Sequence, residues 1–279
     1  MASLLLTGAS GYLGAAIAGT LEAQGIFYDV LPCRLEQLEK KSLRGYQKVI
    51  HAAGALRLRG KVAVDLSNRV GAERLLAALD GTPDVLFISS RAVYGHQPAR
   101  TCAEDDPAHP ADSYGTAKLA AEHAVRESGF PHAILRIPRL IGDSPAGIGH
   151  GFYANTLRYF LTGETVFRYI PDRLDDSLDV RGLARVCADW ASDSTGIPQG
   201  VTNITGNRRS LHGTLAEFAE VARQFGGRPI VQDRLAAEMP WPFMSDRRFR
   251  SAGGSILQRP DEEIAQACCQ KLIGDHRPA

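Results

Sequence analysis

The segment TGASGYLG, residues 7–14, decides the fold, because its glycines at positions 8, 11 and 14 stand between a strand-like and a helix-like stretch. The apolar run Ser3–Leu6 precedes it and is predicted to form a strand. The stretch Leu13–Gln24 follows it and is predicted to form a helix. A strand, a glycine turn and a helix in this order are typical of the first unit of a dinucleotide-binding fold.

Each glycine of the segment has a separate physical task. Gly8 permits a tight turn, Gly11 lets the backbone approach a pyrophosphate, and Gly14 lets the helix pack closely on the sheet. The N–H groups at the start of the helix form an anion site, which the helix dipole strengthens. We therefore predict that a dinucleotide cofactor is contacted by Gly8, Ser10, Gly11, Tyr12, Leu13 and Gly14.

Strand-like runs alternate with helical stretches along the chain, which predicts βαβ units and a parallel sheet. The run DVLFIS, Asp84–Ser89, is largely apolar and is typical of a strand buried on both faces. The other predicted strands are Tyr28–Leu31, Lys48–His51, His132–Arg136 and Thr202–Ile204, with an extended piece at Thr165–Ile170. The other predicted helices are Leu35–Leu43, Lys61–Leu79 (with Val64, Leu75, Leu76 and Leu79 as core positions), Ser113–Ser128, Phe152–Thr162, Val180–Ala191, Leu211–Phe225 and Pro260–Leu272.

These elements predict an α/β fold, a Rossmann-like doubly wound parallel sheet with a small C-terminal substrate-binding portion. The dinucleotide-binding core is expected to span residues 1–140. Residues 141–279 are expected to form mainly the substrate-binding portion, interleaved with late elements of the sheet. The boundary falls at Ile141–Gly151, whose four glycines and one proline predict a loop.

The composition excludes several classes of protein. Lys and Arg number 32 against 31 for Asp and Glu, and this net charge of +1 argues against a nucleic-acid-binding surface. No apolar run approaches the roughly 20 residues that span a bilayer, and the N-terminus carries no leader pattern, so a cytoplasmic protein is expected. Five cysteines without a CxxC pair predict reduced thiols. The eight histidines form no metal-ligand pattern, and no metal site is predicted.

The end of the second predicted strand bears on which nicotinamide dinucleotide binds. At this place NAD-binding folds carry an acid for the ribose 2′-hydroxyl, and NADP-binding folds carry a base for the 2′-phosphate. The stretch VLPCRL, residues 30–35, has no acid and contains Arg34, while Asp29 lies earlier in the strand. NADP(H) is therefore favoured over NAD(H), with Arg34 as the ligand of the 2′-phosphate.

Ser90, Tyr114 and Lys118 form a candidate catalytic set. Tyr114 and Lys118 are four residues apart in a predicted helix and share one face. That helix follows the buried strand that ends at Ser89–Ser90, at the edge where doubly wound sheets bind ligands. A lysine ammonium beside a phenol stabilises the phenolate and lowers the tyrosine pKa toward working pH. Ser90 would form a hydrogen bond with the reacting carbonyl or alcohol oxygen.

Five motifs, in order, resemble those of the extended short-chain dehydrogenase/reductases, the NAD-dependent epimerase/dehydratase group that works largely on nucleotide sugars. They are TGASGYLG (7–14), HAAG (51–54), ISSRAVYG (88–95), EDDPAHPADSYGTAK (104–118) and LRIPRLIG (135–142). The resemblance implies an NAD(P)-dependent oxidoreductase whose catalytic residues are Ser90, Tyr114, Lys118 and Asn68. It adds Ala52, Ala53, Gly54, Tyr114 and Lys118 to the cofactor contacts. Family members often pair through two helices, which implies a homodimer.

The residues after Ser90 narrow the reaction. In the family that this chain resembles, dehydratases have Ser/Thr-Asp-Glu at this point, and the 3,5-epimerase-reductases have a cysteine directly after the serine. This chain has Arg91-Ala92 there instead. The resemblance then implies carbonyl/alcohol redox chemistry, and the short chain favours the NADPH-dependent reduction of a nucleotide-activated 4-ketosugar. An NAD-dependent nucleotide-sugar 4-epimerase and a cofactor-sensing binding protein on the same fold remain as alternatives.

Three arginines are candidate substrate contacts. Arg91 follows Ser90, and Arg139 occupies a place where relatives often have a polar residue near substrate, so each would face a phosphate or a carboxylate. The alternative for each is an ion pair with a nearby acid on the outer face. The third is Arg173. The segment DDSLDVRGLARV (175–186) resembles one in which the family has an arginine just before an aspartate, near the nucleotide diphosphate. Asp175 holds that place here, and Arg173 lies two residues earlier.

Overall fold

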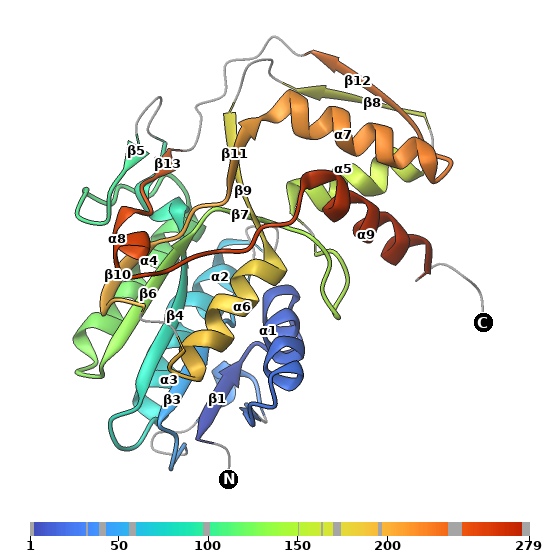
Figure 1. Ribbon diagram of the computed structural model, residues 1–279. Coiled ribbons are helices and arrows are strands. Elements are labelled where there is room, and N and C mark those ends of the chain that lie inside the picture. The colour runs from blue at the N-terminus through green and yellow to red at the C-terminus, as the bar shows by residue number, and fades with distance from the viewer. Residues whose placement is uncertain are drawn as a thin grey trace.

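The computed structural model describes residues 3–31, 33–38, 43–55, 60–96, 101–149, 151–162, 164–169, 174–194, 197–233 and 242–274. Arg173, one of the predicted substrate contacts, lies outside the described residues. Two portions lie next to each other in Figure 1. One is a sheet flanked by helices, and the other is a smaller group of helices and strands beyond the C-terminal ends of that sheet.

The central sheet has six strands, all parallel, in the order β10-β6-β4-β3-β1-β2. Their bounds are β1 Leu4–Thr7, β2 Asp29–Val30, β3 Lys48–His51, β4 Asp84–Ser90, β6 His132–Ile137 and β10 Gly200–Asn203. β1 pairs with β2 on one edge and with β3 on the other, so the strand order reverses between β1 and β3. Ligands of open α/β sheets bind beyond the carboxyl ends of the strands at such a point. The predicted doubly wound sheet is thus confirmed.

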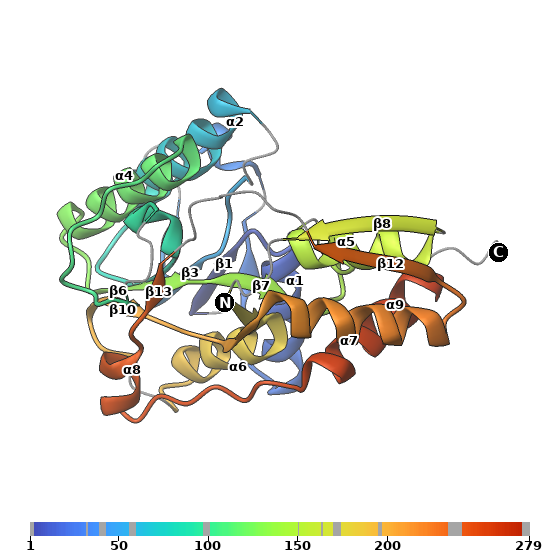
Figure 2. The same cartoon turned by 90° about the horizontal axis from the view of Figure 1, so that it is seen from above.

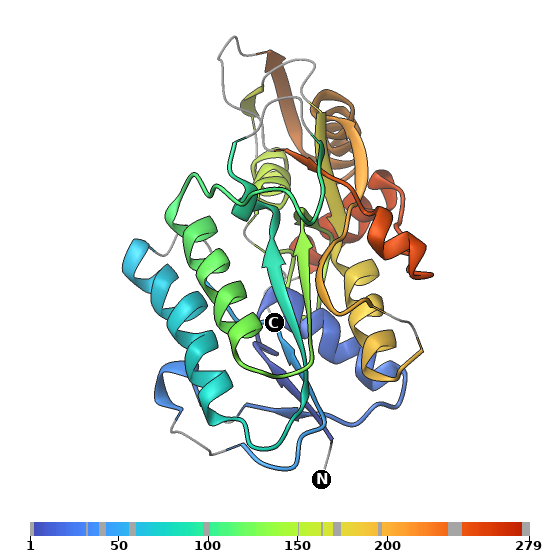
Figure 3. The same ribbon diagram turned by 90° about the vertical axis from the view of Figure 1, so that its left-hand side faces the viewer.

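Helices cover both faces of this sheet (Figures 2 and 3). One face carries α1 (Tyr12–Ala23) and α6 (Val180–Ala191), and the other carries α2 (Lys61–Asp65), α3 (Gly71–Ala78) and α4 (Ser113–Glu127). Of the predicted core positions, Val64, Leu75 and Leu79 are buried and Leu76 is partly buried. Because helices lie on both faces, β4 is buried along nearly its whole length, and its middle residues, Val85–Ile88, are all apolar.

The C-terminal portion has its own apolar core, formed by α5 (Phe152–Leu161), α7 (Leu211–Gln224) and α9 (Asp261–Gly274). β8 (Glu164–Tyr169) pairs in parallel with β12 (Arg228–Asp233). A second small sheet, β11-β9-β7, links the two portions, because β7 (Arg139–Ile141) follows β6 directly. Its other strands are β9 (Leu174–Asp179) and β11 (Asn207–Ser210). A third pair joins β5 (Thr101–Cys102) to β13 (Phe243–Met244).

Residues 252–260, here called the strap, run from α8 (Arg247–Ser251) across the molecule to α9 (Figure 1). The strap contacts β9 and the start of α6, so it connects the two portions a second time. Within the described residues, no helix is long and apolar enough to cross a membrane.

Three predicted elements need correction. Leu35–Gln37 form a single 3₁₀ turn, Leu38 is extended, and Leu43 pairs with Leu79 in an isolated bridge, so the described residues of Leu35–Leu43 do not form the predicted helix. This charged stretch lacks the apolar stripe that holds a longer helix on a core. The helix over Lys61–Leu79 is interrupted by a π turn at Leu66–Val70. The loop at residues 141–151 begins one residue later than expected, because Ile141 ends β7.

Candidate active site

The glycine loop joins β1 to α1 at the point where the strand order reverses. Gly8 has a φ of 78°, which glycine adopts without strain, and a Cβ there would lie 2.7 Å from the backbone of Ala53. A Cβ on Gly14 would lie 1.9 Å from the carbonyl oxygen of Gly8. Only glycine therefore allows α1 to begin this close to the loop. This cradle at a helix N-terminus fits a pyrophosphate.

The end of β3 lies against the same loop. The Nδ1 of His51 is 2.6 Å from the Oγ1 of Thr7. Burial, together with the charge of Lys118, lowers the pKa of His51 to about 3, so its ring is neutral. A Cβ on Gly54 would lie 2.5 Å from the Oδ1 of Asn68 and 3.3 Å from the Nζ of Lys118. The segment HAAG thus reaches from the glycine loop, through Ala53, to the predicted catalytic residues.

The turn that follows β4 (Arg91–Tyr94) touches the first turn of α4, and this contact brings Ser90 and Tyr114 to the same end of β4. The Oγ of Ser90 accepts a hydrogen bond from the N–H of Ala92 at 3.2 Å. α4 begins after Asp112, whose Oδ1 accepts from the N–H of Gly115 at 2.7 Å and caps the helix. A Cβ on Gly115 would lie 2.4 Å from the carbonyl oxygen of Ala92, so the two turns are in direct contact. Tyr114, which is half-buried, lies at this contact.

Lys118 is buried one helical turn after Tyr114. Its Nζ donates to the carbonyl oxygen of Ile88 at 2.9 Å and lies 5.0 Å from the centre of the Phe87 ring. Burial lowers the pKa of Lys118 to about 8, against the opposing effect of the Glu122 carboxylate. The ammonium form is therefore populated at neutral pH and below.

A buried ion pair that the sequence analysis missed holds α4 against the sheet. Glu122 accepts from the Nε and Nη2 of Arg136, on β6, at 3.0 and 2.7 Å, and from the Oγ of Ser89 at 2.5 Å. The side chains of Arg136 and Glu122 are 3% and 0% exposed. Since Tyr114, Lys118 and Glu122 recur every four residues on α4, their spacing alone indicates that all three share one face.

Asn68 lies in the π turn and is buried. Its Nδ2 donates to the carbonyl oxygens of Val64 at 2.8 Å and Ala55 at 3.0 Å. Its Oδ1 has no hydrogen-bond partner among the described residues, although it is buried beside Gly54. A buried acceptor of this kind normally has a protein or water partner. The structure thus brings Asn68 close to Lys118, and its catalytic role stays a prediction.

Arg34 is exposed just beyond β2. Asp29, the acid within β2, accepts a hydrogen bond from the Tyr46 hydroxyl at 3.2 Å. The carboxylate of Asp29 is therefore bound within the protein, whereas Arg34 lies just after the end of β2. The arrangement is compatible with Arg34 as a ligand of a 2′-phosphate, which stays a prediction.

Arg91 and Arg139 meet at one carboxylate. The Nη2 of Arg91 lies 3.0 Å from Oδ1 of Asp175, and the Nη1 of Arg139 lies 2.7 Å from Oδ2. The Tyr153 hydroxyl donates to the same Oδ2 at 3.1 Å. Burial would raise the pKa of Asp175, but the two guanidinium groups hold it below its usual value. Each arginine does pair with an acid, but the shared carboxylate of Asp175 is buried and does not lie on the outer face. Contact of these arginines with substrate stays a prediction.

Asp176, the next residue, was not singled out by the sequence analysis. Its Oδ1 accepts from the N–H of Gly206 at 2.8 Å, and its Oδ2 has no hydrogen-bond partner within the described residues. Burial raises the pKa of Asp176 to about 6. A buried aspartate in a polar strand carries no sequence signal that separates it from a solvent-facing one.

Comparisons with known proteins extend these observations. A UDP-glucose 4-epimerase from Azospirillum brasilense is 28% identical over an alignment of 176 residues, and the match covers 52% of this chain and 51% of that protein. This chain therefore matches only about half the length of that relative. The structure of RMD from Pseudomonas aeruginosa complexed with NADPH superposes with a TM-score of 0.81 at 20% identity, over 98% of this chain and 99% of that one. MoeE5 in complex with UDP-glucuronic acid and NAD gives a TM-score of 0.80 at 20% identity, with the same coverage.

The structural matches confirm the fold, and the family is established by sequence. The family model described as NAD dependent epimerase/dehydratase family matches residues 4–188, which include the glycine loop and all four predicted catalytic residues. A nicotinamide cofactor is thereby supported, and the two matched structures contain NADPH and NAD, respectively. This chain belongs to the NAD-dependent epimerase/dehydratase family.

Proposed function

We propose that this protein uses NADP(H) to reduce a keto group on a nucleotide-activated sugar, as a 4-ketosugar reductase. The observation that carries the proposal is the chemistry next to Ser90. Arg91 is bound to Asp175, and Ala92 has no proton to exchange. Elimination of water needs an acid and a base beside the sugar in addition to Tyr114. Since this side of Ser90 offers neither, carbonyl reduction without dehydration is the reaction that the site supports best.

The protein residues would divide the work as follows. The backbone cradle of Gly8, Gly11 and Gly14 would hold the pyrophosphate, and the bound cofactor supplies the hydride. Ser90 would donate a hydrogen bond to the keto oxygen, and Tyr114 would deliver the proton to it as the alcohol forms. The buried ammonium of Lys118 would stabilise the charge left on the phenol.

The cofactor preference leads to a first prediction. We expect NADPH to bind more tightly than NADH, and Arg34→Ala to weaken NADPH alone by roughly tenfold, because one exposed ion pair with the 2′-phosphate is lost. Titration by cofactor fluorescence measures both constants, and Arg44→Ala, an exposed arginine paired with Asp80, is the matched control. Tighter binding of NADH, or an unchanged NADPH constant in Arg34→Ala, would contradict the assignment.

A 4-epimerase that retains NAD is the second candidate. The observation in its favour is the match to a curated UDP-glucose 4-epimerase. The two reactions differ in their demand for cofactor, because an epimerase regenerates its cofactor within each turnover whereas a reductase consumes one equivalent.

The second prediction separates these candidates. With a nucleotide 4-ketosugar from a purified dehydratase as substrate, we expect one NADPH to be oxidised per sugar reduced, measured by loss of nicotinamide absorbance. No further water should be lost from the sugar, which mass spectrometry of the product checks. Interconversion of two nucleotide-sugar alcohols without added reduced cofactor would instead establish the epimerase.

A further inference from the structure

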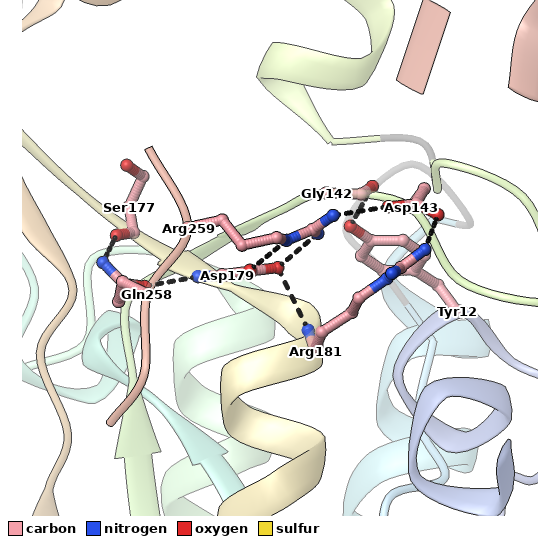
Figure 4. Close-up of polar contacts among 8 residues, drawn as sticks. All are labelled: Tyr12, Gly142, Asp143, Ser177, Asp179, Arg181, Gln258 and Arg259. Carbon is pink, nitrogen blue, oxygen red and sulfur yellow. Dashed lines mark hydrogen bonds and ion pairs between the residues drawn. The ribbon is translucent and has the colours of Figure 1, made fainter. Parts of the chain in front are cut away.

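Arg259 lies on the strap and joins two carboxylates from different parts of the chain (Figure 4). Its Nε and Nη2 bind both oxygens of Asp179, at 2.7 and 2.9 Å, and its Nη1 binds Oδ1 of Asp143 at 3.1 Å. The side chain of Asp179 is 1% exposed, that of Asp143 11% and that of Arg259 15%. Neighbouring Gln258 accepts from the N–H of Asp179 at 2.6 Å. The strap is thus fixed to the junction of β9 and α6 by buried, charge-assisted bonds.

The same ion pairs contact the segment that follows β7. Gly142 has a φ of 116°, and a Cβ there would lie 2.8 Å from Oδ1 of Asp179 and 3.1 Å from the Nη2 of Arg259. Asp143 is also bound by Arg181, whose side chain is largely exposed. The backbone of this segment is therefore in direct contact with the Arg259–Asp179 pair. The carboxylate of Asp143, in the same segment, binds both Arg259 and Arg181.

From this segment the contacts continue into the glycine loop. The Tyr12 hydroxyl donates to the carbonyl oxygen of Gly142 at 2.7 Å. A Cβ on Gly149 would lie 3.0 Å from the Tyr12 ring, so both ends of residues 142–149, here called the cover, contact this side chain (Figure 4 shows the hydroxyl end). Tyr12 is the first residue of α1 and one of the predicted contacts of the dinucleotide cofactor.

We infer that Arg259 is a positioning residue for the cofactor site: through Gly142 and Tyr12 it holds the cover of residues 142–149 against the glycine loop and so sets the rate at which the dinucleotide leaves. Arg259 itself touches none of the predicted cofactor contacts in the described structure. It binds Asp179 and Asp143, which fix Gly142, and Gly142 binds Tyr12. The inference concerns the dinucleotide site alone and does not depend on which sugar is the substrate.

The experiment measures release of NADPH from the full-length protein by stopped-flow fluorescence, with excess NADP⁺ as the displacing ligand. We expect Arg259→Gln to raise the dissociation rate roughly tenfold while the association rate changes little, as is usual when a bound complex loses supporting contacts. Arg259→Lys, which keeps the charge but lacks the planar fork that binds both oxygens of Asp179, should fall between. Arg250→Gln is the matched control, because Arg250 forms an exposed pair with Asp246 next to the strap.

Tyr12→Phe tests the route of the effect, since it keeps the ring and every contact of the strap but removes the bond to Gly142. It should also speed release, and the double variant with Arg259→Gln should release no faster than the faster single variant, because both changes open the same cover. The inference would be overturned if the two increases in release rate multiplied in the double variant, or if Arg259→Gln left the release rate unchanged. If Arg259→Gln fails to fold, an unchanged rate in Tyr12→Phe overturns it alone. Absence of keto-sugar turnover in the parent protein would count against the proposed function only, because the release rates are compared without the sugar.

Discussion

Tyr114→Phe is expected to lower turnover about 10²- to 10⁴-fold, the usual contribution of a general acid, while the cofactor dissociation constant stays within a few-fold of the parent. The phenol would deliver its proton in the transition state and contribute little to binding in the ground state. Steady-state turnover and cofactor titration on the same preparation measure the two effects. Turnover above about a tenth of the parent would contradict the assignment and favour a cofactor-sensing protein.

Two companion variants separate the roles of the set. Lys118→Met should weaken cofactor binding as well as turnover, because the family resemblance places this ammonium at the nicotinamide ribose. Ser90→Ala should lose less turnover than Tyr114→Phe, since one hydrogen bond to the substrate oxygen disappears while the proton donor remains. Equal losses in all three would mean that these variants disturb the fold rather than separate steps.

Glu122→Gln is expected to lower the free energy of unfolding by about 3–5 kcal/mol, because it leaves the guanidinium of Arg136 buried without its carboxylate. The loss should be large for this pair, whose side chains are 3% and 0% exposed. Urea unfolding at pH 7, with the midpoint and slope fitted together, measures it.

The control is Glu73→Gln, which removes one acid of an exposed pair with Arg69 and should change stability by no more than about 0.5 kcal/mol. The double variant Glu122→Leu with Arg136→Met removes both charges and should recover much of the loss. If the double variant is less stable than Glu122→Gln, an unpaired charge is not the cause.

The N-terminal half could be predicted from sequence because its signals are local. The glycine spacing, the apolar run of β4 and the four-residue interval from Tyr114 to Lys118 each lie within one short segment. Each also has one physical interpretation once the segment before and after it is considered. The same interval extended to Glu122 would have placed that acid on the sheet side of α4, but its partner, Arg136, lies in another element.

The linking sheet could not be predicted, because its strands look like loops. LDDSLD in β9 contains three aspartates, residues that are depleted in strands. Two of these buried carboxylates, those of Asp175 and Asp179, are neutralised by arginines from distant segments. Arg91 and Arg139 reach Asp175, and Arg259 reaches Asp179. Such pairings depend on tertiary structure, so a single sequence gives no sign of them.

The π turn at Leu66–Val70 has a consequence for how this helix tolerates change in length. A π turn holds one residue more than the α-helical turn it replaces, and both flanks are fixed here, since Val64 before it and Leu75 after it are fully buried. Deleting one residue within the π turn would therefore restore α-helical bonding and leave the two flanks in nearly the same rotation, so Val64 and Leu75 could both stay in the core. The wide turn itself would be lost, and with it the position of the Asn68 side chain beside Gly54. The extra residue thus serves the site rather than the packing, and its deletion should cost function more than stability.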